Sequence, residues 1–213
     1  MRLRHIKNSE NLIYDSPYVL DDKNFNYNKN ENINIELGMG KGSFIIKNSY
    51  LYKDNNYIGI EKSSTIVLKA IENLKNAKTT YQYDYDNLNF LCIDIDKINE
   101  YFKDDTISKI FINFPDPWPK KRHENRRLTH INFLNKYYSL LKTDSYIEFK
   151  TDNKDLFDFS IEEIKKSKFK LIKYTYDLHN DKEMINGNIM TEYEEKFTKK
   201  NIPICKMILK KLD

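Results

Sequence analysis

Cysteine, glycine, proline and tryptophan are all scarce in this sequence of 213 residues, with two, five, five and one copies. Cys92 and Cys205 lie far apart, and this spacing excludes a disulfide framework and a cysteine-ligated metal site. No segment approaches the roughly 18 uninterrupted apolar residues of a membrane span. The first residues also lack the apolar run of a secretory signal. We therefore expect a cytoplasmic protein without a metal centre and without a membrane partner.

Charged residues are abundant, at 32% of the chain, beside 39% hydrophobic and 14% aromatic residues. This composition suits a soluble domain with one sizeable core. The net charge is only +4, but it is unevenly distributed. Residues 1–107 carry 14 basic and 16 acidic residues, whereas residues 108–213 carry 22 and 16. An anionic partner is therefore expected to meet the second half of the chain.

The scarce residues gather in two short windows. Three of the five glycines are Gly38, Gly40 and Gly42. Three of the five prolines surround Trp118, and three of the five arginines follow within ten residues of it. Since lysine supplies 31 of the 36 basic residues, this retention of arginine marks the second window as a candidate site.

The hydrophobic pattern predicts alternating strands and helices. Strands are expected at 33–37, 57–61, 90–94, 109–114, 146–150, 169–178 and 202–210, and helices at about 43–52, 64–78, 97–103, 128–141 and 154–166. The last two strands have no full helix between them. This order predicts an α/β fold with an open, mainly parallel sheet, an antiparallel C-terminal strand pair and helices on both faces. Residues 1–31 are expected to form an arm and irregular structure, and residues 32–213 a single domain.

Acidic residues stand at the ends of the first three of these strands. Glu36 precedes the turn Gly38-Met39-Gly40-Lys41-Gly42, whose glycines allow close backbone approach to a ligand. Glu61 ends the second strand, where it can accept ribose hydroxyls, and Asp94 ends the third, near an adenine edge. The spacing matches neither a dinucleotide fingerprint nor a P-loop. A nucleoside-type ligand is indicated, with S-adenosyl-L-methionine favoured over NAD; a plain tight turn is the alternative.

A stiff loop leaves the fourth strand, because Pro115, Pro117 and Pro119 restrict φ and remove amide donors. It places Asp116 at the carboxyl end of a strand, where ligands bind in such sheets. Trp118 offers a flat face for stacking on a base, with a core position as the alternative.

A basic run follows this loop: Lys120, Lys121, Arg122, Arg126 and Arg127, with His123 among them and Glu124 as the only acid. It precedes a helix N-terminus, where the helix dipole disfavours cations. Binding of phosphate groups explains the run, and guanidinium suits phosphate better than ammonium. A solvated charged face is the alternative interpretation.

These segments together resemble the bacterial tRNA (guanine-N7)-methyltransferases, enzymes of Rossmann-like class I fold that use S-adenosyl-L-methionine. The most specific shared segment is NFPDPWPKKRHENRR followed by LT (113–129). The segments MRLRH, ELGMGKG, YIGIE, FKTDN, DLHN and GNIMTEYEEKF occur in the family's order. Ile95 departs from the alanine that many relatives carry after the Asp94 position.

The resemblance implies methyl transfer to N7 of guanine 46 in the tRNA variable loop, and a role for each matching residue. Asp116 would be catalytic. The cofactor would contact Glu36, Gly38, Gly40, Glu61, Asp94 and Asp116. The target guanosine would contact Lys120, Asp152, Thr191, Glu192, Tyr193 and Glu194. The basic residues Lys121, Arg122, His123, Arg126 and Arg127 are expected to contact tRNA phosphates. No obligatory protein partner is expected, and the chain would be a monomer or a homodimer.

Three other functions compete with this interpretation. An NAD-dependent oxidoreductase is disfavoured by the glycine spacing. A methyltransferase acting on amino groups would more typically carry D-P-P-Y than Asp116-Pro117-Trp118-Pro119. A non-catalytic RNA-binding protein would need the basic run but neither Glu61 nor the glycine turn.

Overall fold

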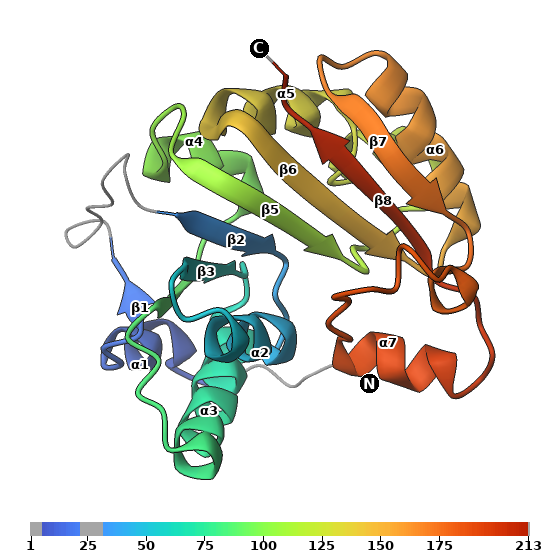
Figure 1. The fold of residues 1–213 in the computed structure, drawn as a ribbon. Helices are drawn as coiled ribbons and strands as arrows, with labels where there is room; N and C mark the ends of the chain where they lie inside the picture. The colour runs from blue at the N-terminus through green and yellow to red at the C-terminus, as the bar shows by residue number, and fades with distance from the viewer. Residues whose placement is uncertain (1–5, 22–31, 213) are drawn as a thin grey trace.

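The computed structural model describes residues 6–21 and 32–212. Within them, eight strands form one sheet in the order β1-β4-β3-β2-β5-β6-β8-β7 (Figure 1). The strands are β1 (Val19–Leu20), β2 (Ile33–Leu37), β3 (Asn56–Ile60), β4 (Leu88–Leu91), β5 (Ile107–Asn113), β6 (Leu141–Thr151), β7 (Lys170–Thr175) and β8 (Cys205–Lys210). Neighbours from β1 to β6 pair in parallel, and β8 pairs antiparallel with both β6 and β7. The expected fold class is thus confirmed.

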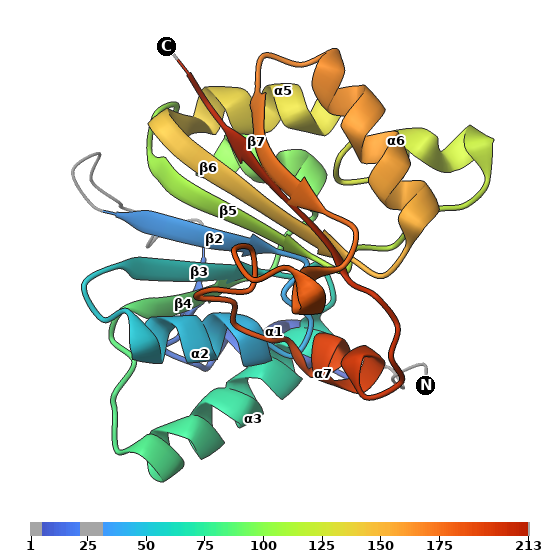
Figure 2. The same ribbon diagram turned by 45° about the vertical axis from the view of Figure 1, so that its right-hand side comes forward.

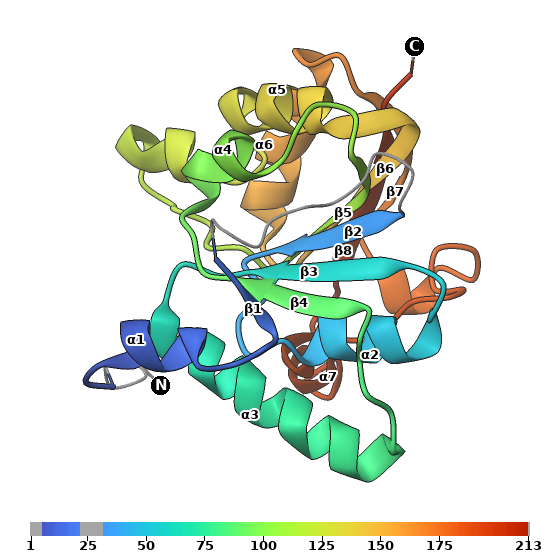
Figure 3. The ribbon, with the colours of Figure 1, turned by 90° about the vertical axis from the view of Figure 1, so that its left-hand side faces the viewer.

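Helices cover both faces of the sheet. They are α1 (Ser9–Tyr14), α2 (Ser43–Leu51), α3 (Ser64–Tyr81), α4 (Ile98–Tyr101), α5 (Ile131–Leu140), α6 (Lys154–Lys165) and α7 (Glu192–Thr198). Figure 3 shows α4, α5 and α6 on one face and α1, α2 and α3 on the other. Figure 2 shows the segment that carries α7 lying beside α2.

The sheet separates two apolar cores, as the alternation of side chains along a strand requires. Ile58 and Ile60 of β3 join the core that contains Leu134 of α5 and Phe157 of α6. Tyr57 of the same strand joins the core of α2 and α3. Because parallel strands covered on both faces have no polar face, β2 is buried at all five residues.

The segment expected to be an irregular arm contains two short elements. Helix α1 packs against α3, where the Ser9 and Ser64 hydroxyls lie 2.7 Å apart in a buried hydrogen bond. Strand β1 pairs with β4 through Val19 and Leu20 and so extends the sheet. Short elements of this kind carry little periodicity and depend on the surface they pack against. Residues 1–5 and 22–31 of the expected arm lie outside the described residues.

The fold brings the carboxyl ends of β2 and β5 side by side. The chain moves from β2 outward to β3 and β4, then returns to β5 on the opposite side of β2. Ligands bind outside such a reversal of strand order. The glycine turn after β2 and the proline loop after β5 therefore lie at the same edge of the sheet.

Candidate functional site

The glycine turn after β2 has open space beside two of its three glycines. Gly38 and Gly40 have φ of 72° and 57°, and a Cβ added to either would meet no atom of the described residues within 4 Å. The amides of Gly38 and Met39 donate to the Ile60 carbonyl, both at 2.9 Å, and tie the turn to β3. Gly42 differs, because its Cβ would lie 3.2 Å from Cβ of Ala70. The first two glycines thus leave room for a ligand, whereas the third allows packing of α3.

Glu36 lies in β2, two residues before Gly38, and is almost completely buried. Its Oε1 accepts a hydrogen bond of 2.9 Å from Nδ2 of Asn113, but its Oε2 has no hydrogen-bond partner among the described residues. Burial raises the pKa of this carboxyl from 4.5 to about 8, despite the Asn113 bond and the nearby charge of Lys150. A hydrogen-bond donor or a cation placed beside Oε2 would therefore favour the ionised carboxylate.

The next two acidic strand ends lie along the same edge. Oε1 of Glu61 accepts from the amide of Ser63 at 3.1 Å, and burial raises the pKa of this carboxyl. Asp94 is exposed and caps the 3₁₀-helix η1 (Ile95–Lys97), accepting from the Asp96 amide at 3.1 Å. Both side chains are held by the amides that follow them, which fixes their direction at the ends of β3 and β4.

Asp116 is exposed on the loop that follows β5. On either side of it, Phe114 and Trp118 have positive φ, of 50° and 40°, which is uncommon for bulky residues. The guanidinium of Arg127 donates to the carbonyls of Pro117 and Trp118, at 3.0 and 3.1 Å. Arg127, which lies outside the loop, thus helps to hold the loop in a strained conformation.

The basic run forms the 3₁₀-helix η2 (Lys121–Arg126) and the residues beside it. Lys120, Lys121, Arg122 and Arg126 are exposed, and His123 is partly buried against Trp118, with ring centroids 5.9 Å apart. The guanidinium of Arg126 lies 5.0 Å from the centroid of the Trp118 ring. One side of the tryptophan thus already carries a cation. The exposed cations are accessible to phosphate, whereas the guanidinium of Arg127 bonds to the loop.

The segment before and in α7 faces the same edge. The Tyr193 ring lies 5.0 Å from that of Phe114, and its pKa is raised by burial and by the nearby charge of Asp152. Glu192 lies 4.0 Å from Nζ of Lys41 in the glycine turn. Thr191 is the N-cap of α7, because its Oγ1 accepts from the Glu194 amide at 2.9 Å. Thr191 and Glu194 therefore shape this segment.

Glu194 is fully enclosed. Its Oε2 lies 2.6 Å from Nζ of Lys150, and its Oε1 lies 2.7 Å from Nδ2 of Asn188 and 3.2 Å from Nε2 of His179. Lys150 also donates to the Ile189 carbonyl at 2.9 Å. The contact of Glu194 with guanosine, expected from the resemblance, stays a prediction, and the carboxylate seen here is committed to these neighbours.

Asn113 and Lys150 were missed by the sequence reasoning, although both belong to segments it singled out. Asn113 satisfies one oxygen of Glu36, and burial lowers the pKa of Lys150, partly offset by Glu194. The signal for these two residues in the sequence was their position along the predicted strands. Each lies on the same face of the sheet as Glu36, once β2, β5 and β6 are aligned.

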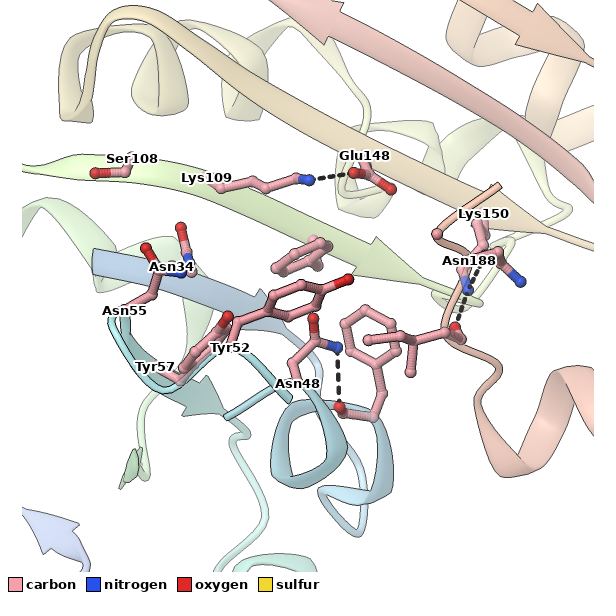
Figure 4. A pocket seen from close by; sticks show the side chains of 14 residues that line it. Asn34, Asn48, Tyr52, Asn55, Tyr57, Ser108, Lys109, Glu148, Lys150 and Asn188 are labelled. Carbon is pink, nitrogen blue, oxygen red and sulfur yellow. Dashed lines mark hydrogen bonds and ion pairs between the residues drawn. The ribbon is translucent and has the colours of Figure 1, made fainter. Parts of the chain in front are cut away.

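A cavity of about 310 Å³ opens on the α2 face, further toward the amino ends of the strands (Figure 4). Asn34, Tyr57 and Ser108, from the first halves of β2, β3 and β5, line it together with Lys150. An ion pair between Lys109 and Glu148 spans its upper wall in this view. The cavity shares Lys150 with the buried charges but none of the acidic strand ends. We therefore place the candidate site at the carboxyl edge.

Comparison with known proteins finds sequence relatives that cover the whole chain. A family model described as "Putative methyltransferase" matches residues 30–207. The tRNA (guanine-N(7)-)-methyltransferase of Mycoplasma pneumoniae is 42% identical over 100% of both chains. The enzyme of that name from Lachnoclostridium phytofermentans is 44% identical, over 98% of this chain and 97% of its own. This chain belongs to the tRNA (guanine-N7)-methyltransferase family.

Solved structures agree on the architecture of this family member. A structure titled "Structure of an antibiotic related Methyltransferase" aligns with a TM-score of 0.62 over 86% of this chain and 94% of its own. At 18% identity, this likeness concerns the Rossmann-like fold alone. Among the described residues, no helix is both long and apolar enough to cross a membrane. Nor do these residues include a group of three or more His, Cys, Asp or Glu side chains placed to hold a metal ion.

Proposed function

We propose that this methyltransferase transfers the methyl group of S-adenosyl-L-methionine to N7 of guanine 46 in the variable loop of tRNA. The surroundings of Glu36 favour S-adenosyl-L-methionine as the methyl donor. Within residues 6–21 and 32–212, its buried Oε2 has no hydrogen-bond partner, and the turn that follows β2 has open space at Gly38 and Gly40. A buried carboxyl in this state is stabilised by a cationic donor, and the methyl donor carries an ammonium group.

The other acidic strand ends suit the rest of a nucleoside. Glu61 directly follows β3, where a carboxylate can accept two ribose hydroxyls, and Asp94, three residues after β4, can reach an adenine edge. When bound, S-adenosyl-L-methionine supplies an electrophilic methyl group on a sulfonium. The residues present fit this group, since acceptors and open backbone lie together along one edge.

Asp116 has an electrostatic role in this proposal. N7 of guanine carries a lone pair and no proton, so no obligatory general base is required. What the chain must supply is alignment and exclusion of other nucleophiles. Positive charge moves onto the purine as the methyl group arrives, and the carboxylates of Asp116 and Asp152 can stabilise it there. These two carboxylates can also accept hydrogen bonds from N1 and N2 of guanine. Lys120 would contact the same nucleoside.

The RNA partner is supported by the relatives' names and by the exposed cations after Trp118. Lys121, Arg122 and Arg126 extend into solvent next to Asp116 along the chain, so a bound polyanion would lie close to the reacting base. Contacts from Arg2 and Arg4 are a further expectation, but these residues lie outside the described part of the chain. Residence in the cytoplasm and a monomeric or homodimeric state also stay predictions.

Labelled S-adenosyl-L-methionine and unmodified tRNA test the proposal directly. After incubation with the protein, the RNA is cleaved chemically at N7-methylguanosine. We expect one cut in the variable loop, and none in a matched transcript with adenine at position 46. Label incorporated without this cut would move the target atom and favour an amino-group methyltransferase. Binding of the methyl donor without incorporation would contradict the choice of RNA.

A further inference from the structure

Arg127 differs from the other arginines of the basic run in what its guanidinium contacts. Its Nε donates to the Pro117 carbonyl at 3.0 Å and its Nη2 to the Trp118 carbonyl at 3.1 Å. The same group lies 4.2 Å from the ring centroid of Phe159, on α6. Arg127 is partly buried, whereas Arg122 and Arg126 are exposed. Two of its N–H groups and one of its faces are therefore used within the protein.

The loop that Arg127 holds would not be stable by its own local preferences. Phe114 and Trp118, which bracket Asp116, both have φ in the left-handed region. Bulky residues occupy this region only when surrounding contacts enforce it. The amide of Phe114 donates to the Lys150 carbonyl at 2.8 Å and fixes the first end of the loop. The two bonds from Arg127 fix the second end.

We propose that Arg127 is a positioning residue for Asp116 rather than a contact for tRNA phosphate. The two carbonyls belong to consecutive residues, and the planar guanidinium fork reaches both at once while its face stacks on Phe159. A lysine ammonium in this place has the charge but not the fork. The effect on turnover rests on the proposed role of Asp116, but the effect on loop conformation does not.

The single tryptophan of the chain makes this proposal measurable. Trp118 accepts one of the two Arg127 bonds, so its fluorescence reports the loop without interference from any other indole. In Arg127→Gln and Arg127→Lys we expect shifted emission and increased quenching by acrylamide, with global unfolding still cooperative. If Arg127→Gln does not fold, Phe159→Leu, which removes the stacked ring and keeps the charge, is expected to change the emission in the same direction.

Kinetics separate positioning from phosphate binding. A loop displacement of about 1 Å can lower turnover about 100-fold. We expect losses approaching this size in both Arg127 variants, with no rescue by lysine and little change in the KM for tRNA. The slope of log K for tRNA binding against log salt concentration should stay unchanged, because no phosphate contact is lost.

Arg122→Gln and Arg122→Lys are the matched controls, since Arg122 is an exposed arginine of the same run. Arg122→Gln is expected to reduce the salt slope by about 0.7–0.9, and lysine to restore it. The same pattern in the Arg127 variants, with Trp118 emission unchanged, would overturn the proposal. If the unsubstituted chain methylates no tRNA, the proposed function fails, while the Trp118 fluorescence still decides the role of Arg127.

Discussion

Two sets of polar residues meet at the carboxyl edge of the sheet, and they differ in burial. The buried polar cluster consists of Glu36, Asn113, Lys150 and Glu194, each less than 10% exposed. The exposed rim consists of Asp94, Asp116, Lys120 and Arg122. Members of the cluster bond to one another or to neighbouring backbone. Members of the rim point largely into solvent, where a ligand can reach them.

Because of this difference in burial, we expect substitutions in the cluster to change stability and substitutions in the rim to change turnover. A charge taken out of water is tolerated only when it is paired or neutralised, so changes in the cluster should alter folding. A solvated charge loses little when substituted, so changes in the rim should alter only what the site binds or stabilises. The four tests below examine the cluster, the rim and then the glycine turn, in order of decreasing expected effect.

Lys150→Met tests the cluster most severely. It leaves the Glu194 carboxylate buried without its cation, and we expect a loss of about 3–5 kcal/mol in the free energy of unfolding. Urea denaturation measures this loss. The control is Lys165→Met, which breaks the exposed pair with Glu162 and should cost about 0.5 kcal/mol or less. Similar losses in both variants would show that the burial of Lys150 has no energetic consequence.

Glu36→Gln should change how stability depends on pH. The pKa of Glu36 is about 8 in the folded chain and 4.5 as its ordinary value, so the folded state binds the extra proton between these limits. Its contribution is present below pH 4.5 and is lost as pH rises through 8. Since one pKa unit corresponds to about 1.4 kcal/mol, the variant should be more stable than the unsubstituted chain at pH 8, by on the order of 4 kcal/mol, and about equal near pH 4.5.

Thermal or urea unfolding at pH 5 and pH 8 measures this difference. Glu72→Gln is the control, because Glu72 is an exposed carboxylate on α3 that pairs with Lys69 at 2.8 Å. The difference in stability between this variant and the unsubstituted chain should be the same at both pH values. A Glu36→Gln protein that follows the unsubstituted chain at both pH values would show that burial does not hold the proton on Glu36.

Asp116→Asn should leave stability unchanged and lower turnover. Loss of one preorganised charge at a reacting centre costs about 100-fold in rate, and the affinities for methyl donor and tRNA should be kept. Single-turnover methylation with separate binding measurements tests this. Asp104→Asn, an exposed carboxylate before β5 at the opposite edge of the sheet, should match the unsubstituted chain. Unchanged turnover in Asp116→Asn would remove the electrostatic role.

Gly38→Ala and Gly42→Ala separate ligand space from packing within one turn. Both place a side chain at positive φ, which costs about 1–2 kcal/mol. Gly42→Ala should cost about 1 kcal/mol more, because its Cβ would lie 3.2 Å from that of Ala70. Gly38→Ala should instead weaken binding of the methyl donor. Equal donor affinities in the two variants, measured by calorimetry, would contradict the separation.

Much of the fold could be predicted from local pattern. The strand at 33–37 matches β2, and the helix expected at 154–166 agrees with α6 within one residue. The strand expected at 90–94 begins two residues earlier and ends at Leu91, because Asp94 turns to cap η1. Helix α7, between the last two strands, was not predicted, since Thr191 and Glu194 form a cap whose apolar support, Phe114, lies far away in the sequence.

The residue types at the strand ends, the glycine turn and the proline loop are encoded locally. Sequence periodicity and these punctuating residues were therefore sufficient for the α/β class and for the set of acidic strand ends. They were not sufficient to identify the partners of the buried polar residues, because Glu36 and Asn113 are 77 residues apart, and Lys150 and Glu194 are 44 apart. Burial and hydrogen bonding over such separations exist only once the strands are ordered. For that reason tertiary structure alone showed which charges are enclosed, and that Arg127 bonds the loop beside Asp116.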